Sequence, residues 1–114
     1  MKDITTREDC VFLIKCFYDK LLVDTEIGHF FTKLPLHEHI ERVASFWAFI
    51  LLDQSGYLGN MMDAHAHLKL TNADFERWLA LFHETIRTHF HGDKADLAIQ
   101  RSSLIAWTMR SKLT

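Results

Sequence analysis

The stretch that decides the fold class is LHEHIERVASFWAFILL, positions 36–52. It contains neither glycine nor proline, and its apolar residues recur at helical spacing. The residues that share one face, within about 100° on a helical wheel, are His39, Val43, Phe46, Trp47 and Ile50. Pro35 suits the approach to such a helix or its first turn. The stretch therefore predicts an amphipathic helix and puts His39 on its apolar side.

The same periodicity predicts a helix on the N-terminal side of this stretch. It starts near Thr5 or Thr6 and ends near Val23, and Thr5 with Glu8 has the spacing of a capping box. Its apolar stripe consists of Cys10, Ile14, Phe17, Tyr18 and Leu21. A connection with Gly28 and two phenylalanines then leads to Pro35.

Three further helices are expected on the C-terminal side. A loop at 55–60 precedes a short helix over 61–68, in which Met61, His65 and Leu68 share a side. The next helix begins at Thr71, with Asp74 three residues later, and its inner stripe is Phe75, Trp78, Leu79, Phe82 and Ile86. The last helix covers about 94–110 and is capped by Asp93. Along one of its sides lie Leu97, Arg101, Leu104, Ile105 and Thr108.

Composition supports one all-α domain over residues 1–114. Four glycines and one proline are too few for a turn-rich β architecture. An up-down bundle and a globin-like packing both fit this pattern. The formal net charge of −2 disfavours nucleic-acid binding, including a helix-turn-helix reader. We expect a cytoplasmic protein without a membrane span, since no signal peptide is evident and the longest near-apolar stretch, 43–52, is too short.

The eight histidines and two cysteines do not suggest a metal site made by protein ligands alone. Six of the histidines form three His-x-His pairs, at 37/39, 65/67 and 89/91. Residues two apart on a helix point to opposite sides, whereas helical zinc sites use ligands four apart. Cys10 and Cys16 form no CxxC pair and are expected to be buried or half-buried as small hydrophobic residues.

Four inward-facing polar side chains suggest a shared pocket instead. His39, His65, Tyr18 and Trp78 each lie on an apolar stripe, and each carries a group that needs a partner when buried. A haem slot combines an apolar, aromatic lining with one axial imidazole and hydrogen-bond donors on the open face. The simpler alternative is a small helical protein–protein interaction module, which holds no cofactor and whose buried polar groups are all hydrogen-bonded. The helical-wheel analysis does not exclude this alternative.

The ordered set of aromatic and histidine positions resembles the truncated haemoglobins, most of all group III. The resemblance covers about residues 10–110. It rests on Phe17-Tyr18, His39-x-x-x-Val43-x-x-Phe46-Trp47, Gly59-x-x-Met62-x-x-His65-x-x-Leu68-x-Leu70 and Phe75-Glu76-Arg77-Trp78-Leu79-Ala80-Leu81-Phe82. It implies a two-over-two helical sandwich around haem b.

The resemblance also implies roles for individual residues. His65 corresponds to the proximal iron ligand, with His67 as the competing ligand, and the distal residues are Tyr18, His39 and Trp78. The haem pocket would be lined by Phe31, Val43, Phe46, Leu68 and Phe75. Candidates to contact the propionates are Tyr57, His67, Lys69 and Arg77. The family often has proline where this chain has Met61 and Lys69, which bears on how His65 is oriented.

The function implied by the resemblance is binding of O₂ and of other diatomic ligands, CO and NO, at a histidine-ligated iron. A polar distal pocket is compatible with detoxification of NO or of reactive oxygen species, through NO dioxygenase-like or peroxidase-like activity. Such turnover needs a reductase or another electron donor. A haem-trafficking or sensor role would call for an exchangeable haem or a signalling domain, and the sequence shows no second domain.

Overall fold

The computed structural model of the chain describes residues 1–55 and 69–113. Most of the expected loop at 55–60 and the whole of the expected short helix at 61–68 lie outside the described residues. So do four of the candidate site residues, Tyr57, His65, His67 and Leu68.

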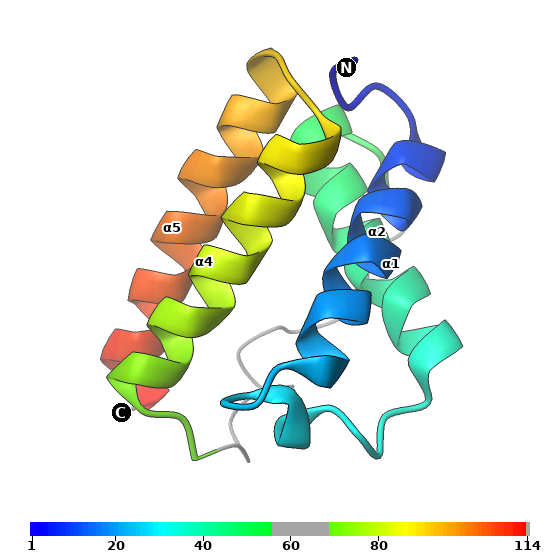
Figure 1. Ribbon diagram of the computed structural model, residues 1–114. Coiled ribbons are helices and arrows are strands. Elements are labelled where there is room, and N and C mark those ends of the chain that lie inside the picture. Colours follow the sequence, from blue (N-terminus) through cyan, green and yellow to red (C-terminus); the bar gives the residue numbers. More distant parts are fainter. Residues whose placement is uncertain (56–68, 114) are drawn as a thin grey trace.

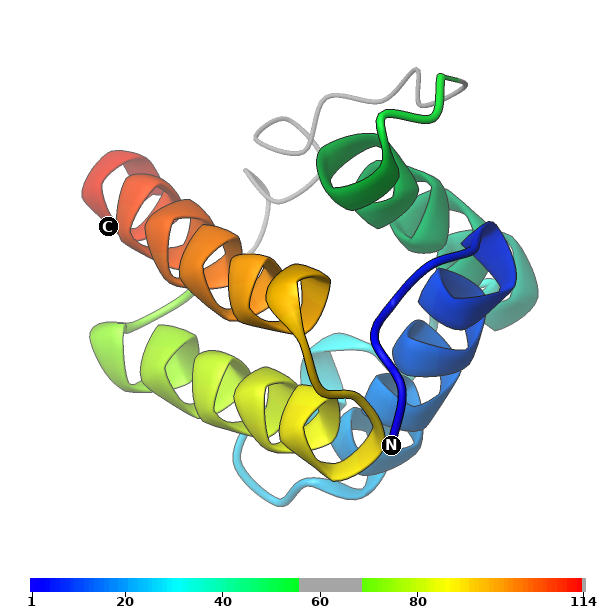
Figure 2. The same ribbon diagram turned by 90° about the horizontal axis from the view of Figure 1, so that it is seen from above.

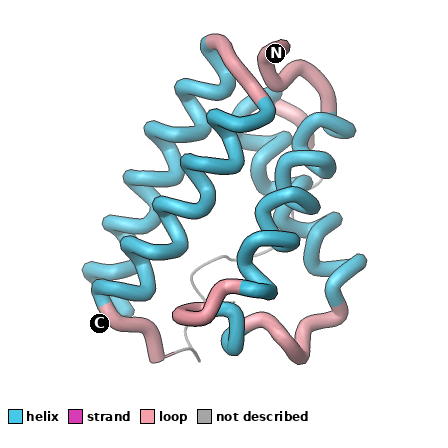
Figure 3. The backbone as a smooth tube through the Cα atoms, viewed as in Figure 1, coloured by secondary structure: helices cyan, strands magenta, loops and turns pink. Residues whose placement is uncertain are grey.

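Four long helices and one short 3₁₀ helix form the described structure (Figures 1 and 3). Their bounds are α1 Arg7–Val23, η1 Gly28–Phe30, α2 Leu36–Leu52, α4 Asn72–His89 and α5 Asp93–Leu113. Within the described residues the β structure is confined to one isolated bridge, between Lys2 and Phe90. None of the described helices is both long and apolar enough to cross a membrane.

The helices form two antiparallel pairs, α1 with α2 and α4 with α5 (Figures 1 and 2). α1 packs against both α2 and α4, while α2 also contacts α5. All five residues of the stripe predicted for the first helix are buried, together with Leu13. The pattern in the sequence therefore placed the correct face of α1 in the core.

Capping boxes begin α1 and α4. In α4 the pair is Thr71 and Asp74, as the sequence predicts. In α1 the predicted pair of Thr5 and Glu8 is wrong. The pair is Thr6 and Asp9, one residue later, and the Asp9 carboxylate accepts the backbone N–H groups of both Thr5 and Thr6. The aspartate satisfies donors that the start of a helix otherwise leaves unpaired.

The start of α5 is capped from the other end of the chain. The Asp3 carboxylate accepts hydrogen bonds from the backbone N–H groups of Lys94 and Ala95, both at 2.9 Å. Asp93, the cap expected from the sequence, is the first residue of the helix instead. Gly92 makes the approach possible, because its φ of +134° suits glycine and an added Cβ would lie 2.7 Å from the Asp3 carboxyl carbon.

We expect Asp3→Ala to lower the free energy of unfolding by about 0.5–2 kcal/mol, the usual worth of an N-cap. Burial opposes ionisation of Asp3, but the N–H groups of Lys94, Ala95 and Ile4 outweigh it and lower its pKa from 3.8. The stabilisation is therefore present above pH 3.8 and is lost as the pH falls through the lowered pKa. Urea unfolding of both variants at neutral and acid pH measures this. Asp93→Ala is the control, and an equal loss there would contradict the cap.

α5 packs through small side chains rather than through its large apolar ones. Its buried residues are Ala95, Ala98, Ser102, Ala106 and Met109. Along the side singled out in the sequence, Arg101 is exposed and Leu104 is 54% exposed. Trp107, which continues this side, is 58% exposed. Small residues let α5 lie close to α4, and the buried Ser102 hydroxyl lies 3.0 Å from His83 Nε2 across that contact.

Candidate functional site: a donor-lined cavity

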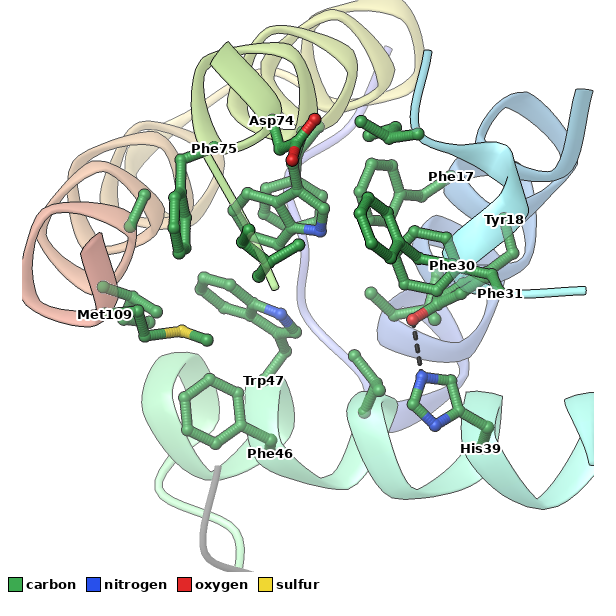
Figure 4. A pocket seen from close by; sticks show the side chains of 18 of the residues that line it. Phe17, Tyr18, Phe30, Phe31, His39, Phe46, Trp47, Asp74, Phe75 and Met109 are labelled. Atoms are coloured by element: carbon green, nitrogen blue, oxygen red, sulfur yellow. Dashed lines mark hydrogen bonds between the residues drawn. The ribbon is translucent and has the colours of Figure 1, made fainter. Parts of the chain in front are cut away.

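A cavity opens between α1, η1, α2, α4 and α5 (Figure 4). The empty space between its walls is about 1090 Å³ including its open mouth. Its lining is mostly aromatic and aliphatic, with a few polar side chains. The polar ones are Tyr18, His39, Arg42, Trp47, Asp74 and Trp78. This composition is typical of a pocket for an apolar ligand that is oriented by a few polar contacts.

Tyr18 and His39 form a hydrogen-bonded pair at one end of the cavity (Figure 4). The Tyr18 hydroxyl lies 2.6 Å from His39 Nε2, and the two rings meet edge to face at 5.2 Å. Tyr18 is only 5% exposed, and burial raises the pKa of its hydroxyl far above the usual value of 10.0. The hydroxyl therefore keeps its proton at neutral pH and can act as a donor.

A stack of three aromatic rings crosses the cavity wall from α2 to α4. Phe82 contacts the indoles of both Trp47 and Trp78, with centroid distances of 5.1 and 5.3 Å. Phe17 meets the Trp78 and Phe82 rings edge to face. Such contacts stabilise a fixed ring orientation beyond the burial of apolar area. The two indoles are thus held in place by their neighbours.

Both of these indoles belong to residues that line the cavity. Within the described residues, neither the Trp47 nor the Trp78 side chain makes a hydrogen bond. Every side-chain nitrogen or oxygen atom there that is fully shielded from solvent does have a hydrogen-bond partner. Their Nε1 atoms are therefore not closed off inside the protein, and the cavity is the space that both residues line. The cavity wall combines an O–H donor of Tyr18 with the N–H groups of two tryptophans.

Comparisons with known proteins agree with this arrangement. No known family profile matches the sequence. A group 3 truncated haemoglobin of Campylobacter jejuni is 28% identical over 107 residues, which cover 88% of this chain and 84% of that protein. The crystal structure of a group III truncated haemoglobin from Campylobacter jejuni matches with a TM-score of 0.88 and 27% identity, over 100% of this chain and 96% of that one. The chain is therefore similar to the group III truncated haemoglobins in both sequence and fold. The truncated globin fold predicted from the sequence is thereby confirmed.

The connection between α1 and α2 brings two phenylalanines to the cavity. Gly28 begins η1 so close to the end of α1 that an added Cβ would lie 2.8 Å from the Leu21 carbonyl oxygen. The close approach carries Phe30 and Phe31 to the cavity wall. Phe31 meets the Tyr18 ring edge to face at 5.8 Å, so it also limits how far the tyrosine can turn.

Two charged side chains, Arg42 of α2 and Asp74 of α4, line the cavity. Asp74 accepts the backbone N–H of Thr71 in the capping box of α4. The Arg42 side chain makes no hydrogen bond or ion pair within the described residues. It can therefore contact an anionic group of a bound ligand.

The two described candidates for propionate contacts lie elsewhere. Arg77 binds the Asp24 carboxylate with both Nε and Nη2, at 2.9 and 2.6 Å, and Glu26 with Nε at 3.1 Å. The hydrogen bond from Arg77 lowers the pKa of Asp24. Arg77 therefore ties α4 to the segment after α1. Lys69 is exposed and does not line the cavity either.

The structure brings most of the described candidate residues together. Those that line the cavity are Tyr18, Phe31, His39, Val43, Phe46, Phe75 and Trp78. Sequence reasoning did not assign a site role to Arg42, Trp47 or Asp74. The signal for Trp47 was present, since it shares the apolar stripe of His39 and Phe46. Arg42 is three residues after His39 on the same helix, and its charge made it look like an ordinary surface residue.

Proposed function

We propose that this protein is a truncated haemoglobin, which holds haem b in the cavity and binds diatomic ligands, O₂, CO and NO, beside Tyr18 and Trp78. The observation that carries this proposal is the composition of the cavity. Its walls are apolar and aromatic, and O–H and N–H donors open onto it. A helical interaction module whose buried polar groups are all hydrogen-bonded would have no need of two indole N–H groups without partners in residues that line a cavity.

The residues that line the cavity fit a haem in their chemistry. The flat, apolar face of a porphyrin suits contacts with Phe31, Val43 and Phe75. Its two carboxylates need cationic or hydrogen-bonding partners, and Arg42 can supply one. When bound, a haem supplies an iron with one coordination position open to small ligands.

His65 is the residue that we propose as the iron ligand. It lies outside the described residues, so the support comes from the sequence. The spacing Gly59-x-x-Met62-x-x-His65-x-x-Leu68 is part of the family pattern that the resemblance rests on, and the chain is similar to group III truncated haemoglobins in sequence and fold. Neutral imidazole is a common axial ligand of haem iron.

The polar residues that line the cavity would then act on the bound ligand. Tyr18 and Trp78 donate hydrogen bonds, and His39 holds the Tyr18 hydroxyl by their shared hydrogen bond. Such donors favour a ligand that carries partial negative charge over one that stays neutral. We expect slow release of O₂ and less preference for CO than an apolar pocket would give.

Turnover of NO or peroxide is a further part of the proposal. His39 is half-buried and adjoins the Tyr18 hydroxyl, so it can pass a proton between the cavity and the outside. Any such cycle needs electrons from a separate reductase or another donor. We propose ligand binding as the primary function and turnover as a consequence of the same polar residues.

An absorption spectrum of the purified protein tests the haem proposal. Haemin is titrated into the protein, and spectra are taken before and after dithionite and then with CO. A saturable, one-to-one Soret band that shifts with CO is the expected result. A well-folded protein that takes up no haemin would overturn the proposal and favour the interaction module.

The position of Arg42 leads to a prediction about haem retention. Because it is an exposed residue at the cavity, an ion pair with a haem carboxylate is worth about 0.2–1 kcal/mol, which corresponds to at most about fivefold in affinity. We expect Arg42→Ala to speed transfer of haem to an excess of apomyoglobin by up to that factor. Arg77→Ala is the matched control, because its guanidinium is bound to Asp24. A larger effect of Arg77→Ala would assign the contact to Arg77 instead.

A further inference from the structure

We infer that Trp47 is an additional hydrogen-bond donor to the small ligand, so that it helps to set which diatomic molecules bind. This inference rests on the proposed function. It adds a residue that the sequence pattern assigns only to the apolar stripe of α2. Trp47 is therefore a specificity-determining residue rather than a core residue alone.

Trp47 is buried from bulk solvent, but the nitrogen edge of its indole borders the cavity. The residue is 3% exposed, and it lines the cavity together with Tyr18 and Trp78. Its Nε1 has no hydrogen-bond partner within the described residues. This atom is therefore not fully shielded from the surrounding space, since no fully shielded side-chain nitrogen or oxygen atom there lacks a partner. A tryptophan N–H in a buried position usually has a partner. A ligand in the cavity can supply that partner.

The orientation of the indole points the N–H toward the other donors. Figure 4 shows the nitrogen edge of Trp47 turned toward the side of the cavity that holds Tyr18 and His39. The Tyr18 hydroxyl marks that side, since its hydrogen bond with His39 fixes where it lies. The three donors thus come from α1, α2 and α4 and face a common space.

Packing fixes this orientation. The Trp47 ring lies against Phe82 at 5.1 Å with an interplanar angle of 33°, and Phe46 meets it edge to face at 5.5 Å. The Phe82 ring is itself stacked against the Trp78 indole. Turning the Trp47 ring would break this stack, so the donor is preorganised and little entropy is lost when it binds a ligand.

The inference predicts a change in discrimination between O₂ and CO. Trp47→Phe keeps an aromatic ring and removes the N–H. Loss of one hydrogen bond is expected to lower the ratio of O₂ affinity to CO affinity by roughly 2- to 10-fold. The stretching frequency of added CO should rise, because a positive dipole near its oxygen is lost. The haem-loaded protein is used throughout, and loading is verified first by the Soret band.

Leu51→Ala is the control variant for packing. Leu51 is a buried residue of the same helix that does not line the cavity and carries no polar group. A purely structural role of Trp47 would lower thermal stability in both variants and leave the CO stretching frequency unchanged in both. That result, with normal haem loading, would overturn the inference about Trp47 while leaving the proposed function intact. Failure of the unmodified protein to take up haem would overturn the proposed function itself.

A second measurement needs no substitution at Trp47. The chain has three tryptophans, so protein labelled with ¹⁵N-tryptophan gives three indole N–H signals. Trp107 is 58% exposed on the outer side of α5 and serves as an internal reference. We expect the Trp47 and Trp78 signals to differ between O₂-saturated and CO-saturated protein, and the Trp107 signal to stay in place. A Trp47 signal that is the same with both gases would contradict the inference.

Discussion

Replacing His65 with glycine should abolish stable haem binding, and this is the largest effect that we expect. Residues that merely orient a metal ligand are worth about 10- to 100-fold in affinity, so loss of the ligand itself should weaken haem retention by at least about 100-fold. The cavity walls are made by α1, α2, α4 and α5, which pack on one another through described residues. They should therefore remain folded in the variant. Haemin titration followed by the Soret band measures the loss.

Two controls separate ligation from a general disturbance of the 56–68 segment. His67→Gly removes the competing imidazole two residues away and should leave the spectrum unchanged. Added imidazole should restore a six- or five-coordinate spectrum in His65→Gly, because the vacated position accepts a free ligand. If His67→Gly loses the haem and His65→Gly keeps it, the assignment of the iron ligand must be exchanged between the two.

The sequence was sufficient to predict most of the cavity, because amphipathic periodicity is a local property. The inward faces of α1, α2 and α4 were each defined by a stripe of apolar residues at helical spacing. His39, Val43 and Phe46 are half-buried rather than buried, as expected for residues that line a space instead of filling the core. The fully buried residues of α2, among them Ile40, Ala44 and Leu51, lie beside that stripe.

The features that the sequence could not predict depend on contacts between distant parts of the chain. Asp3 caps a helix that begins ninety residues later, and no local pattern indicates such a pairing. On α5 both sides carry apolar residues, so a helical wheel cannot tell which of them is buried. The alanines and Ser102 are buried because α4 lies close by, and Leu104 and Trp107 remain outside. Arg77 similarly depends on where the segment with Asp24 lies.

The second large effect is expected for Tyr18→Phe in haem-loaded protein. A buried hydrogen bond to a ligand with negative charge is worth roughly 1.5–3 kcal/mol, so O₂ should be released about 10- to 150-fold faster without it. Tyr18 is suited to this role because burial keeps it protonated and its ring is held by Phe17 and Phe31. Stopped-flow displacement of O₂ by CO measures the rate. CO release should change much less, since CO carries little charge.

His39 should act on O₂ release through Tyr18 rather than independently. The Tyr18 hydroxyl oxygen lies 2.6 Å from His39 Nε2 and carries one proton. The tautomer of the imidazole therefore decides whether that proton faces His39 or the ligand. We therefore expect the double variant Tyr18→Phe/His39→Leu to release O₂ no faster than Tyr18→Phe alone. Additive effects would show that the histidine contacts the ligand itself.

Trp78→Phe completes the test of the polar wall, because it removes the donor from α4 and leaves the Tyr18–His39 pair in place. The indole is stacked on Phe82 at an interplanar angle of 18°, and phenylalanine can keep that contact. We expect faster O₂ release here too, with the larger of the two effects identifying the dominant donor. If neither Tyr18→Phe nor Trp78→Phe speeds release, the ligand does not bind at this wall, and the convergence of donors on the cavity needs another explanation.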